Sequence, residues 1–234
     1  MNFSCWHIAT ILLICISQAY AADQLPSQQE FYPANGKGRV VVVITGQTGP
    51  ASYAYYAKDI AAQGYYAVLA DGNDFWGEGL SRNHAGLDRL KGVLAHAQQS
   101  PHALPGKVAV IGFSLGGAAC LTYAARMPES VFAVVTYYPD TRFIVNPGDF
   151  ASKIRVPTLV LAGVLDRYKD CCVIERAREL AAAGKAGGGR PTLTLVEYPS
   201  AGHGFAIKRF KSWRSDDAAD AFRRTLDYLK QNST

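Results

Sequence analysis

Continuous apolar runs alternate with segments of helix-forming residues along most of this chain, and this alternation limits the folds open to it. The runs are rich in β-branched side chains, and strands are expected over residues 39–44, 65–70, 108–112, 131–137, 158–162 and 192–198. Helices are expected between them, over residues 52–63, 84–99, 115–126, 173–183 and 216–230. Continuous apolarity, rather than strict alternation, is typical of parallel strands covered on both faces. The pattern therefore predicts an α/β fold with a mostly parallel sheet and helices on both of its faces.

Local signals set further expectations near the end of the chain. The last expected helix begins at Ser215-Asp216-Asp217, which is interpreted as its N-terminal cap, with charges that suit the helix dipole. Residues 185–191 are rich in glycine and are expected to form a loop inside the domain rather than a domain linker.

The first 21 residues are interpreted as a secretory signal. Ile8 to Ile16 is almost wholly apolar and is followed by Ala19-Tyr20-Ala21, a pattern that predicts cleavage after Ala21. An apolar stretch of about nine residues is too short for a bilayer, which takes roughly 20; the alternative is an uncleaved anchor. Residues 22–234 suit a single domain with one core. We therefore expect an exported protein, periplasmic or secreted, without stable membrane insertion after cleavage.

Export decides which of the five cysteines remain in the mature chain and whether they can form disulfides. Cys5 and Cys15 leave with the signal, whereas Cys120, Cys171 and Cys172 remain, and an odd number cannot pair completely. Because an oxidising compartment permits disulfides, three patterns stay open: a bridge between the adjacent cysteines, a bridge to Cys120, and three free thiols. No metal-ligand spacing accompanies these residues, so no metal is expected.

The formal net charge of +5 is mild and spread along the chain, which does not favour a nucleic-acid partner. The local exception is a basic stretch made of Lys208, Arg209, Lys211 and Arg214. It is interpreted either as a solvated face beside the last helix or as a patch that attracts an anionic substrate or surface.

A serine framed by glycines stands where an expected strand turns into an expected helix. The segment is Gly112-Phe113-Ser114-Leu115-Gly116-Gly117. A sharp turn of this kind strains the serine backbone and needs small neighbours, which Gly112 and Gly116 provide. The hydroxyl then projects at the carboxyl edge of the sheet, where open parallel sheets place their sites. Ser114 is therefore the candidate nucleophile, and the plainer alternative is a turn whose serine only caps the helix.

A serine nucleophile needs a base, because its hydroxyl is barely ionised near neutral pH. In the chain order nucleophile, acid, histidine, His203 is the histidine that follows Ser114, and it lies in a glycine-flanked loop after the last expected strand. The acid is expected in the loop after the strand over residues 158–162, and Asp166 stands in that loop. Asp166 would orient the imidazole and stabilise the imidazolium formed during attack. Asp170 and Asp140 are competing candidates for the acid.

An oxyanion requires two aligned donors. The backbone N–H of Leu115 is expected to supply one, and the backbone N–H of Gln47, in the loop after the first expected strand, the other. Tyr53, Phe75 and Trp76 lie near the expected mouth of the site and are candidates for a substrate pocket. Ordinary core or surface packing is the equal alternative for these aromatic side chains.

At these residues the sequence resembles the dienelactone hydrolase family of the α/β-hydrolases, from about Val40 to the C-terminus. The motifs that carry the resemblance are the serine turn, Ala162-Gly163-Val164-Leu165-Asp166, Gly202-His203-Gly204-Phe205, and Asp71-Gly72-Asn73-Asp74-Phe75-Trp76-Gly77. The resemblance implies an α/β-hydrolase fold and hydrolysis of an ester or lactone through an acyl-enzyme, with neither metal nor organic cofactor.

Two departures from the family pattern refine this expectation. The family's namesakes carry Cys at the nucleophile where this chain has Ser114, which favours a general carboxylesterase over an enzyme for dienelactone itself. Few residues of the mature chain precede residue 39, so a reduced sheet of six or seven strands is expected.

The residues together predict an exported serine hydrolase with Ser114, His203 and Asp166 as its triad and a small-molecule ester or lactone as its partner. The alternatives are an amidase, peptidase or acyltransferase on the same triad, and a non-catalytic binding protein that has kept the fold. The natural substrate and the oligomeric state are left open.

Overall fold

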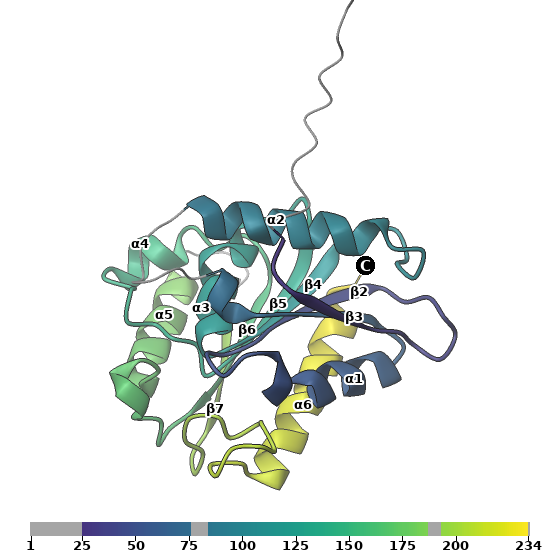
Figure 1. Cartoon of the computed structure of the whole chain (residues 1–234). Coiled ribbons are helices and arrows are strands. Elements are labelled where there is room, and N and C mark those ends of the chain that lie inside the picture. Colours follow the sequence, from purple (N-terminus) through teal and green to yellow (C-terminus); the bar gives the residue numbers. More distant parts are fainter. Residues whose placement is uncertain (1–24, 76–83, 187–192, 234) are drawn as a thin grey trace, which may run out of the picture.

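The computed structural model of the protein describes residues 25–75, 84–186 and 193–233 (Figure 1). The expected signal (residues 1–21), Trp76 and most of the glycine-rich loop lie outside the described residues. None of the helices within the described ranges combines the length and the apolar character needed to cross a membrane.

A seven-stranded sheet lies at the centre of the molecule, in the order β1-β3-β2-β4-β5-β6-β7. The first strand pairs antiparallel with β3, and the other pairings are parallel. The strands are β1 (Gln28–Phe31), β2 (Val40–Ile44), β3 (Tyr66–Ala70), β4 (Val108–Phe113), β5 (Val131–Tyr137), β6 (Thr158–Gly163) and β7 (Leu193–Tyr198). Strands β2 to β6 are buried along their whole length, which explains why their sequences are continuously apolar.

Helices cover both faces of this sheet (Figure 1). On one face lie α1 (Ala54–Ala62) and α6 (Ser215–Gln231), which pack with Val41 and Val43 of β2. The opposite face, with Val40, Val42 and Ile44, is covered by α2 (His84–Gln99), α3 (Leu115–Thr122), α4 (Pro147–Ala151) and α5 (Ile174–Ala186). Because side chains alternate along a strand, β2 contributes to two separate hydrophobic cores.

The architecture confirms the predicted α/β fold with a mostly parallel sheet. The sheet has seven strands, where six or seven were expected. Strand β1 has no counterpart in the expected set, because Gln28–Phe31 lacks an apolar run and lies at the edge of the sheet. The helix expected over residues 115–126 ends at Thr122 and is followed by a separate 3-10 turn, Ala124–Arg126.

The expected cap of the last helix is wrong. Arg214 occupies the N-cap position of α6, and no side chain caps the helix there. Ser215 is already the first helical residue, whereas Asp216 and Asp217 lie in the first turn, where the helix dipole favours negative charge. Arg214 Nε lies 2.5 Å from the Asp217 carboxylate, so an ion pair takes the place of the expected cap.

Strands β2 and β4 lie side by side at the switch point of the sheet. The chain passes from β2 to β3 on one side, whereas β5, β6 and β7 are added on the other. Ile44 of β2 is paired with Gly112 of β4, so the loops that follow these two strands begin next to each other. Open α/β sheets bind their ligands at this point, beyond the carboxyl ends of the strands.

Strand β7 forms the edge of the sheet opposite β1, and no further described strand pairs with its outer side. Glu197 of β7 accepts two hydrogen bonds from Arg178 of α5, at 2.9 Å from Nε and 2.5 Å from Nη2. The edge strand therefore carries a paired charge.

Candidate active site

Ser114 occupies the turn between β4 and α3 with φ 50° and ψ −111°, a backbone conformation that L residues rarely adopt. Its N–H donates to the carbonyl oxygen of Tyr137 at 2.9 Å, and its own carbonyl oxygen accepts from the N–H groups of Ala118 and Asp140, both at 3.0 Å. These bonds to β5, α3 and the loop after β5 hold the strained residue in place. Ser114 thus stands at the carboxyl end of the sheet and the N-terminus of α3.

Two flanking glycines permit this turn, because other atoms approach their Cα atoms closely. A Cβ atom at Gly112 would lie 2.5 Å from the Cys120 sulfur, and one at Gly116 would lie 2.5 Å from the carbonyl oxygen of Thr45. A side chain at either position would force α3 away from the sheet, since interiors packed this closely have no spare volume.

Asp166 and His203 come from the loops that follow β6 and β7, which are neighbouring strands. The loops are joined by a hydrogen bond from the Leu165 N–H to the carbonyl oxygen of Ala201, at 2.9 Å. Asp166 is 0% exposed; its Oδ2 lies 2.8 Å from His203 Nδ1, and its Oδ1 accepts from the N–H of Tyr168 at 3.0 Å. A buried carboxylate with both oxygens engaged has one orientation, and it fixes the imidazole in turn.

Within the described residues, neither competing acid forms a hydrogen bond with His203. Asp140 is held by Arg142, with 2.6 Å between Oδ2 and Nη2 and 3.2 Å between Oδ1 and Nε. These hydrogen bonds raise the pKa of the Arg142 guanidinium. Asp170 is exposed at the end of the 3-10 turn Tyr168–Asp170. The structure therefore brings Asp166 to His203 and places Asp140 on a different partner.

Two tyrosine rings enclose His203. Tyr168 stacks on the imidazole, with 4.5 Å between centroids and 13° between planes, and Tyr138 meets it edge-on at 4.8 Å. Tyr138 belongs to the same loop as Asp140, whose N–H binds the Ser114 carbonyl, so this loop contacts both Ser114 and His203. Within the described residues no hydrogen bond joins the Ser114 hydroxyl to His203. Sequence reasoning missed both tyrosines; their one signal was position, directly after β5 and beside Asp166.

The two expected oxyanion donors leave adjacent strands at the same edge. Gln47 and Leu115 are each the third residue after the paired residues Ile44 and Gly112. As the first residue of α3, Leu115 has an N–H group without an intrahelical acceptor. Gln47 is exposed, and among the described residues its N–H group makes no hydrogen bond. Both groups are thus free to donate to a ligand.

Asn73 anchors the turn that holds Gln47, a contact that sequence reasoning missed. Its Nδ2 donates to the carbonyl oxygen of Gln47 at 3.2 Å and to Asp71 Oδ1 at 2.7 Å. The same Asp71 oxygen accepts from the Asn73 N–H at 3.0 Å. Asn73 stood within the motif after β3, but nothing in the sequence connected it to the loop after β2.

Tyr53 and Phe75, two of the aromatic candidates for a substrate pocket, lie in the core. Tyr53 is 1% exposed, with its ring centroid 5.0 Å from that of Phe113, and burial raises its pKa to about 12. Phe75 is 2% exposed and packs in the core on the opposite face of the sheet. Both side chains therefore take the packing role that the sequence left open, and Trp76 lies outside the described residues.

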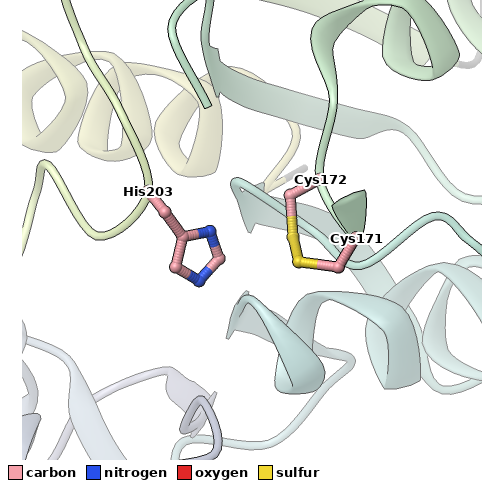
Figure 2. A group of neighbouring side chains, drawn as sticks. All are labelled: Cys171, Cys172 and His203. Atoms are coloured by element: carbon pink, nitrogen blue, oxygen red, sulfur yellow. A yellow bond between two sulfur atoms is a disulfide. The ribbon is translucent and has the colours of Figure 1, made fainter. Parts of the chain in front are cut away.

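The cysteines adopt one of the three patterns left open. Cys171 and Cys172 form a disulfide, whereas Cys120 is a buried free thiol. Figure 2 shows the imidazole of His203 facing this disulfide, and a ring nitrogen and the two sulfur atoms all lie within 4.8 Å of one another. Spacing gave no sign of this group, because His203 is distant from the cysteines in the chain.

The basic stretch runs through the loop between His203 and α6. The Lys208 ammonium lies 5.4 Å from the centre of the Tyr55 ring, and Arg214 pairs with Asp217. Two of its four basic side chains therefore have contacts inside the protein.

Comparisons with known proteins identify the family and the fold of this chain. A family model described as the dienelactone hydrolase family matches residues 29–233. A Methylorubrum extorquens protein named as a carboxymethylenebutenolidase is 32% identical over 152 residues, which are 62% of this chain and 50% of that protein. A Yersinia pestis protein of the same name is 26% identical over 89% of this chain and 86% of its own length. The crystal structure of a Klebsiella pneumoniae protein named as a dienelactone hydrolase has a TM-score of 0.70 and 22% identity, covering 85% of this chain and 89% of that one. This likeness shows the α/β-hydrolase fold.

Proposed function

The chain belongs to the dienelactone hydrolase family, and from this premise we propose that it is a serine hydrolase that cleaves a carboxylic ester or lactone through an acyl-enzyme. The observation that carries the proposal is the 2.8 Å contact between His203 Nδ1 and the buried Asp166 carboxylate, with the loop Tyr138–Asp140 in contact with both His203 and Ser114. This arrangement supports an oriented base at the same edge of the sheet as the candidate nucleophile.

In the proposed attack, Nε2 of His203 takes the proton of the Ser114 hydroxyl as Oγ bonds to the carbonyl carbon of the substrate. Asp166, on Nδ1, keeps the imidazole in the tautomer whose Nε2 carries a lone pair and stabilises the imidazolium that forms. Substrate would complete the contact between Ser114 and His203, since such hydrogen bonds are often long in empty sites.

The free N–H groups of Leu115 and Gln47 are proposed to hold the oxyanion that develops on the carbonyl oxygen. Donors fixed before the reaction stabilise this charge without having to reorganise. When the intermediate collapses, the imidazolium protonates the leaving oxygen. Water, activated by His203, then attacks the acyl-enzyme and frees Ser114.

The test is labelling by a fluorophosphonate and hydrolysis of a p-nitrophenyl ester. The wild type should react with both, and Ser114→Ala should react with neither. Ser152→Ala is the matched control, because Ser152 caps α4 and its hydroxyl bonds the Asp149 carbonyl oxygen. Hydrolysis by Ser114→Ala at the wild-type rate would disprove the proposal.

Substrate preference distinguishes the proposed ester or lactone hydrolase from an amidase that uses the same residues. A panel of esters of increasing acyl length, lactones and anilides should give the highest kcat/KM with an ester or a lactone. A preference for the anilide of the same acyl group would assign the site to an amidase.

We further propose that the protein is exported and that cleavage follows Ala21. The disulfide between Cys171 and Cys172 supports this proposal, because disulfides persist in oxidising compartments. Expression of the full chain in a Gram-negative host should give a periplasmic product that mass spectrometry shows to begin at Ala22. A cytoplasmic product that still carries Met1 would contradict it.

A further inference from the structure

The disulfide between Cys171 and Cys172 lies beside His203, outside the triad proposed above. Cys171 ends the 3-10 turn Tyr168–Asp170, and Cys172 precedes α5. Both residues are 3% exposed. Figure 2 shows their sulfur atoms opposite the imidazole ring, within the 4.8 Å group already described.

The backbone positions Cys171 without help from the sulfur–sulfur bond. The carbonyl oxygen of Cys171 accepts from Thr141 twice, at 2.8 Å from N–H and 3.3 Å from Oγ1. The N–H of Cys171 donates to the carbonyl oxygen of Tyr168 at 3.0 Å. Because these contacts do not involve sulfur, reduction leaves the anchors of Cys171 in place.

Reduction changes what the group can bind. Two thiolates and an imidazole are the donors that a thiophilic divalent ion such as Zn²⁺ prefers, with a fourth position left for water. Metal–sulfur bonds of about 2.3 Å and metal–nitrogen bonds of about 2.0 Å put neighbouring donors roughly 3.5 Å apart. The ring nitrogen and the sulfur atoms therefore need to approach one another by only about 1 Å from their outer limit of 4.8 Å, and the two sulfur atoms move apart once the bond between them is reduced.

His203 is already prepared as a ligand. Its Nδ1 is engaged by the buried carboxylate of Asp166, so Nε2 carries the free lone pair. Histidine ligands commonly donate their other ring N–H to a carboxylate, which orients the ring and makes it a stronger donor. Asp166 would serve a bound metal in this way.

We propose that reduction of the Cys171–Cys172 disulfide by a thiol reductant creates a binding site for a thiophilic divalent cation, with Cys171, Cys172 and His203 Nε2 as its ligands. Two equivalents of thiol give up two electrons and two protons, form one disulfide among themselves and leave two cysteine thiols in the protein. Binding of the cation then releases those two protons and forms two metal–sulfur bonds and one metal–nitrogen bond.

A cation bound at this site inhibits ester hydrolysis, a consequence that rests on the proposed function. The lone pair that would accept the Ser114 proton is the one that binds the metal. The oxidised protein is therefore insensitive to zinc, and the reduced protein is inhibited by it.

The binding experiment uses the full chain with Cys5→Ser and Cys15→Ser. The cysteines that remain are then Cys120, Cys171 and Cys172. The probes are Co²⁺, read by thiolate-to-cobalt charge-transfer absorption, and Zn²⁺, read by equilibrium dialysis. After reduction and removal of the reductant, the protein should bind one ion per chain with this absorption. The oxidised protein should show none.

Variants locate the site. Cys171→Ser and Cys172→Ser should each abolish the charge-transfer band of a two-thiolate site, and Cys120→Ala should keep it, because Cys120 lies in α3 under the serine turn. His203→Ala should weaken zinc at least by the roughly tenfold to hundredfold that loss of a supporting contact costs. Binding that survives in Cys171→Ser/Cys172→Ser, or its absence in the reduced parent, would overturn the proposal.

Ester hydrolysis supplies the second readout. Zinc should inhibit the reduced parent, a chelator should restore the rate, and Cys171→Ser/Cys172→Ser should keep its rate with or without zinc. Equal inhibition of that double variant would show that zinc acts elsewhere and would overturn the proposed inhibition through this site. A parent that binds cobalt through thiolates but neither hydrolyses esters nor reacts with a fluorophosphonate would retain the metal site and refute the hydrolase.

Discussion

The ring of Tyr168 stacks on the imidazole of His203, with 13° between their planes, while the N–H of the same tyrosine donates to Asp166. One residue thus supports two members of the proposed triad, through its side chain and through its backbone. A substitution of the side chain separates these contributions.

Tyr168→Ala should lower kcat while leaving the backbone contact to Asp166 in place. An aromatic pair contributes about 0.5–1.5 kcal/mol, so the rate should fall by up to about tenfold. Tyr168→Phe keeps the stacking and should behave as the wild type. Steady-state kinetics on one ester checks both; equal losses in the two variants would contradict a role for the ring.

Asp166→Asn should reduce kcat by roughly 10⁴-fold, because an amide in place of the carboxylate favours the wrong imidazole tautomer. Asp140→Asn is the matched control, since Arg142 and not His203 binds this carboxylate. It should lower the melting temperature and leave kcat close to that of the wild type. The reverse order of the two losses would assign the acid to Asp140.

Asn73→Ala should lower kcat with little change in KM. The amide of Asn73 holds the carbonyl of Gln47, and a looser turn aligns the Gln47 N–H less well with a developing oxyanion. Complete loss of such a donor costs about 10²–10³ in rate, and a misaligned donor should cost about tenfold. Asn146→Ala is the control: Asn146 caps α4, so its loss should cost about 1 kcal/mol of stability without touching kcat. A rise in KM at constant kcat in Asn73→Ala would instead indicate a role in substrate binding.

Stability should fall at alkaline pH because of the buried phenols of Tyr56 and Tyr137. Their hydroxyls lie 2.9 Å apart, and burial raises the pKa of both groups. In the unfolded chain a phenol ionises near pH 10, so the unfolded state loses its protons first. The contribution of these two phenols to the free energy of unfolding is therefore fully present below about pH 10. Above that pH it falls by about 1.4 kcal/mol per pH unit for each phenol. Urea unfolding measured across this range checks the slope, and Tyr137→Phe should flatten it. An unfolding free energy that stays constant to about pH 11 would contradict the assignment.

The sequence predicts the buried parts of this fold best. Strands β2 to β6 carry continuous apolar runs, and their residues lie within one position of the expected ranges at each end. Strand β1 could not be predicted in this way, because Gln28–Phe31 is polar and is held by pairing with β3. The short α4 depends on Asn146 and Pro147 rather than on helical periodicity.

The candidate site shows the same division. The turn of Ser114 follows from local chemistry, since it needs glycines at fixed spacing. The choice between Asp166 and Asp140 depends on which carboxylate meets the imidazole, and the pairing between β6 and β7 brings the loop of Asp166 beside that of His203. The stacking of Tyr168 and the closeness of the cysteines to His203 are contacts between distant segments, which no spacing in the chain encodes.

The ion pair between Arg178 and Glu197 on β7 has a consequence for the protein at high concentration. An exposed edge strand invites the backbone of another molecule to add to the sheet, which is how ordered aggregates grow. A strand that docked on β7 would remove water from this charged pair. The desolvation costs free energy and therefore disfavours association through this edge. The open edge of the sheet thus carries a charged side chain one residue before β7 ends and the loop to His203 begins.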